Sequence, residues 1–364
     1  MGPPAWIEPL QALVDNRLDA RDRTGFIGLI GDHPSSYARS PRIWNPALDA
    51  LGIDAAYLPF DVPADRLAAV IDTLRRADCL GANVTVPYKV DVLPFLDEVD
   101  GIARAVGAVN TIARDRRGRL IGSNTDGAGL VGALVGDGPD RLMASLEGAT
   151  VLLIGAGGAG RAGAAALAPR LRGGELLVTN RHLARAAAVA RAVTDSGCRS
   201  AVIADEALEA RLASVDLVVN ASSKGQAGIR KSPAGWTCLE PYSALAPATP
   251  PALPPSSEEA FFAAWVARSA ADVAANHAVS RARVRRLPAR VVVYDMVYAP
   301  LETVTLRHAR EAGLRGANGR QMNVAQAVIA FVDHICAAAL AAAGLDPAAA
   351  RATVTRVMAQ AWEG

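Results

Sequence analysis

Three short polar segments in the first third of the chain carry side chains that could do acid–base chemistry. They read Asn-Val-Thr-Val-Pro-Tyr-Lys (83–89), Ala-Val-Asn-Thr (108–111) and Asn-Thr-Asp-Gly (124–127). Lys89 is a candidate proton donor, and Asp126 could orient its ammonium group and help to set its pKa. When hydride reaches a carbonyl carbon, the oxygen gains charge and must be protonated or stabilised. Hydride chemistry at a carbonyl therefore needs a proton donor of the kind that Lys89 could supply.

Thr85 and Asn110, in the same segments, offer neutral hydrogen bonds to substrate hydroxyl groups. Each residue also has an ordinary structural interpretation: Asp126 as a turn or helix-capping residue, Lys89 as a surface charge and Thr85 as a strand residue. Lysine is nearly absent from a chain that otherwise uses arginine for surface charge, which draws attention to Lys89. Lysine occurs only at positions 89, 224 and 231.

A glycine-rich loop in the middle of the chain predicts a dinucleotide site. It follows an apolar strand directly and runs into a helix, which is the context that makes the G-x-G-x-x-G pattern informative. Glycines allow the backbone to turn tightly and approach a pyrophosphate, whose charge meets the helix N-terminus. The alternative is a glycine-rich turn that binds nothing. The expected cofactor-binding glycines are Gly155, Gly157, Gly158 and Gly160.

The strand that follows this loop favours NADP over NAD. An NAD site would place Asp or Glu at the end of this strand, where it binds the ribose hydroxyls. The chain instead has Asn180, Arg181 and His182 there, with Arg185 one helical turn further. Two guanidinium groups suit a 2′-phosphate, and no carboxylate is present to repel it. The alternative is that both arginines are solvated charges on a helix.

The elements that position these residues alternate between strand and helix, which predicts an α/β protein with mainly parallel sheets covered on both faces. In the first region, Pro87 is expected to open a helix, and a hairpin-like pair of strands at 107–112 and 120–123 is expected to end the domain. The remaining expected elements there are strands Phe26–Gly31, Ala55–Phe60 and Gly81–Val86 and helices Arg42–Leu51 and Ala64–Arg76.

The second region repeats the alternation, and a gap of about seventy residues before its last strand predicts an insertion at about 226–290. The Pro-rich stretch Pro233–Pro255 and a helix Glu258–Ala275 lie in that gap. The other expected elements are strands Thr150–Ile154, Glu175–Thr179, Leu217–Asn220 and Val291–Tyr294, and helices Gly127–Val135, Ala159–Leu171, His182–Val193, Gln321–Ala343 and Pro347–Trp362. We expect the last two helices to return to the first domain.

The composition limits the class of protein. The 364 residues suffice for two domains, and 51% hydrophobic with 20% charged residues predicts a globular chain without a membrane span. A net charge of +2 with dispersed arginines gives no nucleic-acid footprint. Four widely spaced cysteines and the lack of a secretory signal predict a cytoplasmic protein with neither a disulfide framework nor a metal site. Monomer and homodimer both stay open.

Taken together, these motifs resemble the shikimate dehydrogenase family. They occur in the family's order and cover the chain from about residue 28 to residue 326. The set comprises G-A-N-V-T-V-P-Y-K, A-V-N-T, N-T-D-G, G-A-G-G-A-G-R, N-R-x-x-x-R, Y-D-M-V-Y and V-A-Q-A.

The resemblance implies an N-terminal α/β substrate domain (24–126, after an extension at 1–23), a Rossmann NADP domain (127–320) and C-terminal helices (321–364) that pack on the substrate domain. It implies NADP-dependent reduction of 3-dehydroshikimate to shikimate, with Lys89 as the acid/base and Asp126 as its partner. The implied substrate contacts are Ser40, Thr85, Asn110, Tyr298 and Gln326, and the implied 2′-phosphate contacts are Asn180, Arg181 and Arg185.

The chain departs from the family at three places. The family holds the substrate carboxylate with two hydroxyls in H-S-x-S-P, whereas this chain has Ala38 at the first and Ser40 at the second; Ser36 or Tyr37 could substitute. The segment that usually reads D-G-x-G-M-L in the family is Asn-Gly-Arg-Gln-Met-Asn at 318–323 in this chain. The predicted insertion at about 226–290 is the third departure from the family pattern. A paralogue for quinate or an aminoshikimate-like acid, and a catalytically idle binding or regulatory protein, therefore stay open.

Overall fold

The computed structural model describes residues 4–20, 22–136, 141–232 and 234–363. These residues divide into two compact units: unit 1 is Met1–Leu130 with Asn323–Gly364, and unit 2 is Val131–Met322. Positions 1–3, 21 and 233, which belong to the predicted extension and insertion, lie outside the described residues. Within the described residues, no helix is both long and apolar enough to cross a bilayer.

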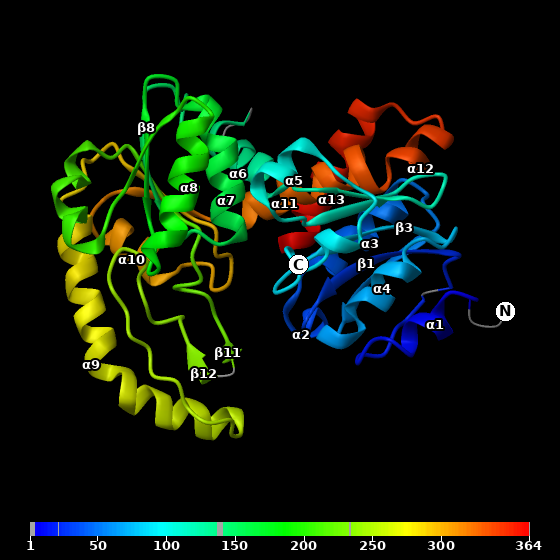
Figure 1. Ribbon diagram of the computed structural model, residues 1–364, viewed down its shortest axis with the longest axis horizontal. Coiled ribbons are helices and arrows are strands. Elements are labelled where there is room, and N and C mark those ends of the chain that lie inside the picture. The colour runs from blue at the N-terminus through cyan, green and yellow to red at the C-terminus, as the bar shows by residue number, and fades with distance from the viewer. Residues whose placement is uncertain (1–3, 21, 137–140, 233, 364) are drawn as a thin grey trace. The chain divides into compact units, whose positions relative to one another are not determined.

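Unit 1 is built on a six-stranded mixed sheet with the order β2-β1-β3-β5-β6-β4 (Figure 1). The β1 strand pairs in parallel with β2 and β3, and the expected hairpin is confirmed because β5 pairs antiparallel with both β3 and β6. Its strands are β1 (Gly25–Gly31), β2 (Ala55–Asp61), β3 (Cys79–Val84), β4 (Glu98–Val99), β5 (Thr111–Arg114) and β6 (Leu120–Ser123).

The helices of unit 1 come from both ends of the chain. They are α1 (Ile7–Gln11), α2 (Pro34–Tyr37), α3 (Ser40–Ala50), α4 (Leu67–Thr73) after a 3₁₀ turn (Ala64–Arg66), α5 (Gly101–Val106), α12 (Ala337–Ala342) and α13 (Pro347–Glu363). Two more helices, α6 (Asp126–Val135) and α11 (Arg320–Ile329), are shared with unit 2. The α13 helix packs on α3. C-terminal helices therefore do contact the first strand–helix unit.

The expected polar N-terminal extension is wrong in one respect, because its apolar residues belong to the core of unit 1. Trp6, Leu10 and Leu18 are buried there, and the Trp6 ring lies 4.9 Å from that of Phe26 on β1. Burial of large apolar side chains is the main stabilising contribution of such segments. The segment therefore covers one part of the sheet instead of lying apart from it.

The predicted helix after Pro87 is also wrong. The structure has turns at 86–92 followed by a short 3₁₀ turn, Leu93–Phe95. The Lys89 carbonyl accepts a hydrogen bond from the Val109 amide at 2.7 Å, so it does not accept the i+4 amide that an α-helix requires. The same bond ties the Lys89 backbone to the chain that leads into β5.

Unit 2 has a six-stranded parallel sheet with the order β14-β13-β10-β7-β8-β9, the arrangement typical of a dinucleotide-binding fold. Sequence analysis missed β9 and β14, which are short and largely exposed. The strands are β7 (Thr150–Ile154), β8 (Glu175–Thr179), β9 (Arg199–Val202), β10 (Leu217–Asn220), β13 (Val292–Asp295) and β14 (Arg315–Asn318). The helices between them are α7 (Gly158–Leu167), α8 (Leu183–Asp195) and α10 (Val304–Glu311).

The insertion between β10 and β13 folds into a hairpin and one long helix. The hairpin pairs β11 (Ile229–Ser232) with β12 (Gly235–Cys238), and the helix α9 (Glu258–Val284) runs along the edge of unit 2 in Figure 1. This helix extends nine residues beyond the predicted end at Ala275. Phe261 and Trp265 on α9 pack with insertion residues into a separate small core. The insertion therefore has a hydrophobic core of its own.

The predicted continuous helix 321–343 is interrupted. After α11 the chain forms a π-helical turn, Ala330–Ile335, in which the Cys336 amide bonds to the Phe331 carbonyl at 2.9 Å. Such single π turns appear mostly as local bulges in α-helices. In this turn the His334 imidazole lies 3.2 Å from the Ser123 hydroxyl at the end of β6.

Candidate active site

A polar cluster forms in unit 1 where β3 and β6 end and the antiparallel β5 begins. The Lys89 ammonium Nζ lies 2.6 Å from Oδ2 of Asp126. The Asp126 carboxylate is buried, and 22% of the Lys89 side chain is exposed. Asp126 begins α6, and the Asn124 side chain accepts a hydrogen bond from its amide at 3.1 Å. The lysine tip therefore stays accessible while its counter-ion is held inside the protein.

Asn110 holds the other oxygen of this carboxylate. Its Nδ2 donates to Oδ1 of Asp126 at 2.8 Å and to the Thr125 hydroxyl at 3.0 Å. Its Oδ1 accepts from the Thr125 amide at 2.9 Å. Because Lys89 and Asn110 each donate to a different oxygen of Asp126, the carboxylate is fixed in one orientation. An ionised acceptor of this kind forms the stronger class of hydrogen bond.

Gln326 joins the same cluster from the C-terminal part of unit 1. Its Oε1 accepts from the Thr125 hydroxyl at 3.1 Å and lies 3.4 Å from Nδ2 of Asn110. The backbone oxygen of Asn323 accepts from its Nε2 at 3.0 Å. The structure thus brings together four of the predicted residues, which are Lys89, Asn110, Asp126 and Gln326.

Sequence analysis missed two residues that link Ser40 to this cluster. Ser40 begins α3, and its side chain hydrogen-bonds with the Tyr57 hydroxyl. The Tyr57 hydroxyl donates to Oδ1 of Asn83 at 2.9 Å, and Nδ2 of Asn83 donates to the Asn110 carbonyl at 3.3 Å. Burial raises the pKa of Tyr57 while Ser40 opposes the rise. The Tyr57 hydroxyl is therefore protonated at neutral pH, as a donor must be. A buried tyrosine in an apolar strand is a general signal for such a partner.

Thr85 lies one residue beyond β3 and is bound through its backbone, with its amide donating to the Ile30 carbonyl at 2.8 Å.

The candidate carboxylate loop, around Ala38 and Ser40, is held by hydrogen bonds between residues close in the sequence. Ala38 ends α2 in an extended conformation, and the Ser36 hydroxyl donates to the His33 carbonyl at 2.8 Å. The Tyr37 side chain is 47% exposed.

The glycine-rich loop of unit 2 has the backbone geometry that a dinucleotide requires. Gly155 has a φ of +108°, and a Cβ there would lie 2.8 Å from the Ser222 amide nitrogen. A Cβ on Gly160 would lie 2.1 Å from the Gly155 carbonyl oxygen, whereas one on Gly157 would meet open space. Gly157 precedes the ten-residue helix α7, which begins at Gly158 and has no side-chain cap. Its first amides can therefore bind an anion.

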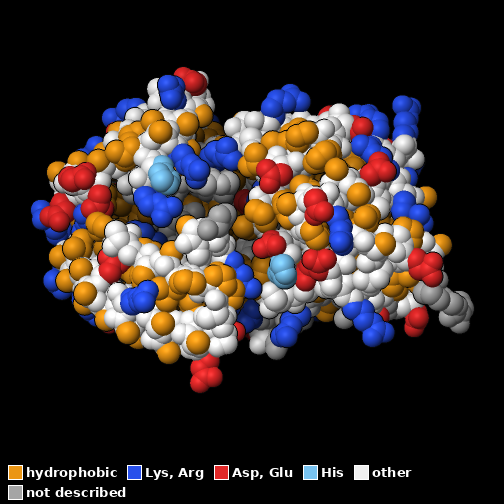
Figure 2. Space-filling model, turned by 60° about the horizontal axis from the view of Figure 1, so that its bottom comes forward, with side chains coloured by type: hydrophobic (Ala, Val, Ile, Leu, Met, Phe, Trp, Pro, Cys, Tyr) orange, Lys and Arg blue, Asp and Glu red, His pale blue; other side chains and the backbone are white. Residues whose placement is uncertain are grey.

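Asn180 joins this loop to the next helix. Its Oδ1 accepts from the Ala156 amide at 3.3 Å, and its Nδ2 donates to the His182 carbonyl at 2.9 Å. Arg181 lies two residues before α8, and Arg185 lies in its first turn, which carries no acidic residue. Figure 2 shows several Lys and Arg side chains close together on the face of unit 2 that this view presents.

One further feature fits a bound dinucleotide phosphate in this unit. The Nε of Arg161, on α7, is buried without a hydrogen-bond partner among the described residues. Unpaired buried donors are rare, and each calls for a ligand, a water molecule or strain as its explanation. The residues present therefore fit the cofactor that the glycine pattern predicts.

Tyr298 belongs to unit 2, on the loop after β13. The base of this loop is held by Asp295, which accepts hydrogen bonds from the Thr303 hydroxyl at 2.7 Å and from Nδ2 of Asn220 at 2.8 Å. Burial raises the pKa of Asp295 to about 7, although the hydrogen bonds it accepts oppose this.

The segment 318–323, which departs from the family pattern, begins a helix. The Asn318 side chain accepts a hydrogen bond from the Arg320 amide at 3.1 Å. Asn318 thus caps the start of α11.

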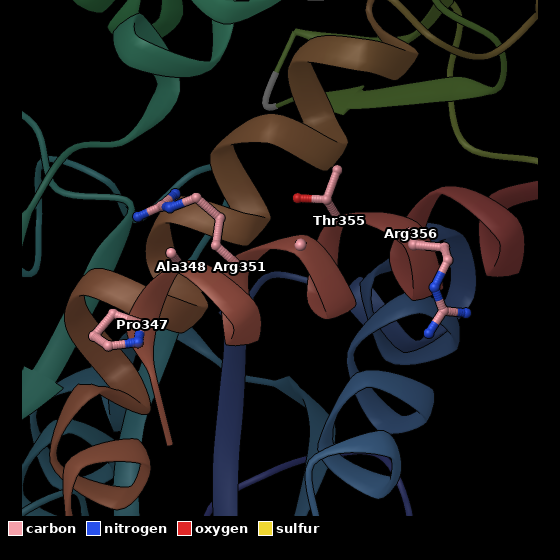
Figure 3. Close-up of a pocket in the computed structure, with 6 residues that line it drawn as sticks. Pro347, Ala348, Arg351, Thr355 and Arg356 are labelled. Atoms are coloured by element: carbon pink, nitrogen blue, oxygen red, sulfur yellow. The ribbon is translucent and has the colours of Figure 1, made fainter. Parts of the chain in front are cut away.

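A cavity of about 650 Å³ lies along α13, and none of its lining residues belongs to the polar cluster. Figure 3 shows Arg351 and Arg356 extending to opposite sides of the helix. Within the described ranges, no group of three or more His, Cys, Asp or Glu side chains is placed to hold a metal ion.

Comparison with known proteins agrees with both halves of this description. The family model of the shikimate dehydrogenase substrate binding domain matches residues 29–112, and that of shikimate / quinate 5-dehydrogenase matches residues 139–234. The chain is 35% identical over 344 residues to the shikimate dehydrogenase (NADP(+)) of Symbiobacterium thermophilum, covering 91% of this chain and 98% of the relative.

Two solved structures share the fold. Shikimate 5-dehydrogenase from Thermus thermophilus, in complex with NADP(H) and shikimate, is 29% identical with a TM-score of 0.59, covering 92% of this chain and 99% of that one. Quinate dehydrogenase from Corynebacterium glutamicum, in complex with NAD, is 27% identical with a TM-score of 0.63, covering 90% and 98%. This chain therefore belongs to the shikimate dehydrogenase family.

Proposed function

We propose that this protein is an NADP-dependent oxidoreductase that reversibly reduces 3-dehydroshikimate to shikimate. The observation that carries the proposal is the Lys89–Asp126 pair with Asn110 on the second carboxylate oxygen. Curated relatives that are 35% and 36% identical to this chain are named shikimate dehydrogenase (NADP(+)), which supports the reaction and the cofactor. In this proposal 24–126 forms the substrate domain and 127–320 the cofactor domain.

Lys89 is the acid/base of the proposed reaction. When bound, the reduced nicotinamide supplies the hydride that reduces the carbonyl carbon. The Lys89 ammonium then donates a proton to the oxygen on which charge develops. Asp126 holds that ammonium in position, with Oδ2 at 2.6 Å from Nζ. In the reverse direction, neutral Lys89 accepts the hydroxyl proton.

The substrate is held by hydrogen-bonding groups around this lysine. We assign Thr85, Asn110 and Gln326 to the ring hydroxyls, Ser40 to the carboxylate, and Tyr298 to a contact from unit 2. Within the cluster, Gln326 and Asn110 hydrogen-bond to other protein groups. Substrate hydroxyls would add to a network whose orientation is set before binding, which reduces the entropic cost of binding.

We assign the dinucleotide to the loop of Gly155, Gly157, Gly158 and Gly160, and its 2′-phosphate to Asn180, Arg181 and Arg185. Guanidinium groups at the end of β8 match a phosphate dianion, which they can bind in a bidentate manner. A ribose hydroxyl would instead favour an acidic residue at the same point. NADP is therefore the proposed cofactor.

A quinate-type substrate is the second candidate, and Ala38 in the carboxylate loop favours it. A steady-state assay of shikimate and quinate, each with NADP and NAD, tests both candidates. We expect the highest kcat/KM with shikimate and NADP. A preference for quinate would transfer the proposal to the second candidate. Binding of the acids without any turnover would instead identify an idle binding protein.

A further inference from the structure

Lys224 lies on a loop that touches the glycine-rich loop. Residues 221–225 follow β10, and the close approach of Gly155 to Ala221 and Ser222 leaves no room for a Cβ at Gly155. In the sheet, β7 lies between β10 and β8. Lys224 and Arg181 therefore follow the two strands that flank β7, one on each side of the loop assigned to the dinucleotide.

Hydrogen bonds fix the backbone of this loop. The Asn220 side chain donates to the Lys224 carbonyl at 3.1 Å and accepts from the Ser222 amide at 2.9 Å. The Asn220 amide group is itself held by Asp295 at 2.8 Å. The Lys224 side chain therefore starts from a preset position beside the glycine-rich loop.

The Lys224 ammonium is a half-buried cation without a carboxylate partner. Its Nζ donates to the Ala246 carbonyl, in the insertion, and no carboxylate among the described residues lies within ion-pair distance of it. A carbonyl satisfies one of its three N–H groups and none of its charge. A charge removed from water without a counter-ion is costly, so an anionic ligand would stabilise it.

The two carboxylates whose charge reaches Lys224 are already engaged. Arg283 binds both oxygens of Asp205, each at 2.8 Å. Asp272 accepts hydrogen bonds from the amide and the hydroxyl of Thr249 at 2.9 and 2.7 Å. Neither acid is free to turn toward Lys224, so no carboxylate among the described residues is left to pair with it.

The electrostatics of the surroundings agree with this geometry. Burial lowers the pKa of Lys224 to about 8; Asp205 and Asp272 act against this shift, whereas the positive charges of Arg283 and Arg181 add to it. An anion that binds between Lys224 and Arg181 would remove their mutual repulsion. It would also raise the pKa of the lysine.

We propose that Lys224 binds a phosphate group of the dinucleotide, from the side of the glycine-rich loop opposite to Arg181. An ammonium is a compact point charge that suits a phosphate oxygen. The group bound is either the pyrophosphate or the 2′-phosphate, which share this chemistry. The assignment rests on the proposed cofactor, and it makes the loop after β10 part of the cofactor site.

Proton uptake on binding tests the proposal in the unmodified protein. Calorimetric titration with NADP at pH 8, repeated in buffers of different ionisation enthalpy, counts the protons bound. Because bound phosphate favours the charged lysine, we expect uptake of about half a proton near pH 8. The 2′-phosphate contributes little there, since the second ionisation of a phosphate monoester lies near pH 6. Tight binding without proton uptake would overturn the proposal.

Lys224→Met supplies the second measurement, with Lys231→Met as its matched control. Lys231 is exposed on β11 against the Trp236 ring, outside the proposed site. We expect Lys224→Met to weaken NADP binding about tenfold at pH 7.5 and to abolish the proton uptake. Lys231→Met should change neither. Equal weakening of NAD would assign the pyrophosphate, and weakening of NADP alone the 2′-phosphate.

An unchanged dissociation constant in Lys224→Met would overturn the assignment. Should this variant fail to fold, the proton count of the unmodified protein decides alone. Failure of the unmodified protein to bind either dinucleotide would overturn the proposed function. Failure of this inference alone would look different, because NADP would then bind with normal affinity but without proton uptake.

Discussion

Lys89 and Lys224 each follow the end of a strand, yet their surroundings differ. Lys89 lies 2.6 Å from a buried carboxylate whose second oxygen is held by Asn110. Among the residues that the structure describes, Lys224 donates to the Ala246 carbonyl alone, and its pKa falls to about 8 chiefly through burial. A lysine that must deliver a proton needs a permanent counter-ion to hold it in place. A lysine that binds an anion can be left without one.

The comparison extends to the strand ends that carry the two candidate sites. The first edge is the end of the unit 1 sheet with the polar cluster, and the second edge is the end of the unit 2 sheet with the glycine-rich loop. In unit 1 the hydrogen-bonding capacity is largely used within the protein, so the cluster is organised before substrate arrives. In unit 2, Arg161 keeps a buried Nε without a described partner, and Arg181 and Arg185 stand at a helix start that has no acidic residue. The groups at the first edge are organised for a reaction, and those at the second edge are suited to binding negative charge.

The largest effect should follow from removing the lysine at the first edge. We expect Lys89→Met to lower kcat at least a hundredfold, because no other group in the described part of the cluster is placed to protonate the developing alkoxide. The Kd for NADP should stay near that of the unmodified protein. Steady-state turnover and fluorescence titration with NADP measure the two quantities.

Lys231→Met is the control for this variant, since it removes the same charge from an exposed strand. If Lys89→Met kept most of its turnover, the Lys89–Asp126 pair would be a structural ion pair. The contrast between the two lysines would then be lost.

An intermediate effect should follow at the second edge. Arg181→Ala should weaken NADP binding by about ten- to a hundredfold and leave NAD binding within a factor of about two, because only NADP carries the 2′-phosphate that we assign to this guanidinium. Binding constants for both dinucleotides measure the ratio. Equal losses for NADP and NAD would place Arg181 outside the 2′-phosphate site, and Arg185→Ala would then be the next variant to measure.

Much of unit 2 could be predicted because its strands are continuous apolar runs. The bounds of β7, β8 and β10 agree with the predicted Thr150–Ile154, Glu175–Thr179 and Leu217–Asn220. Buried parallel strands carry this signal in every residue. The β9 and β14 strands are short and partly exposed, so they lack it, and both were missed.

The errors in unit 1 came from partners far away in the sequence. Residues after Pro87 have the local pattern of a helix start, but Val109 takes the Lys89 carbonyl. Tyr57 stands in an apolar strand, and only the fold reveals that its hydroxyl connects Ser40 with Asn83. Residue types and spacing predict which groups react, whereas the hydrogen bonds that orient them depend on the tertiary structure.

The smallest effect concerns the carboxylate loop, where the first edge lacks one hydroxyl. Ser36 has one hydroxyl proton, and it is donated to the His33 carbonyl, so this residue is poorly placed to replace the hydroxyl missing at Ala38. Ala38→Ser should therefore lower the KM for shikimate several-fold, since a hydrogen bond to a charged group contributes about 1.5–3 kcal/mol before the cost of ordering the new side chain. Ser36→Ala is the control and should leave KM nearly unchanged. If Ala38→Ser had no effect while Tyr37→Phe raised KM, Tyr37 would be the second carboxylate contact. If shikimate stayed a poor substrate in all three variants while quinate turned over well, the loop would be suited to a different acid.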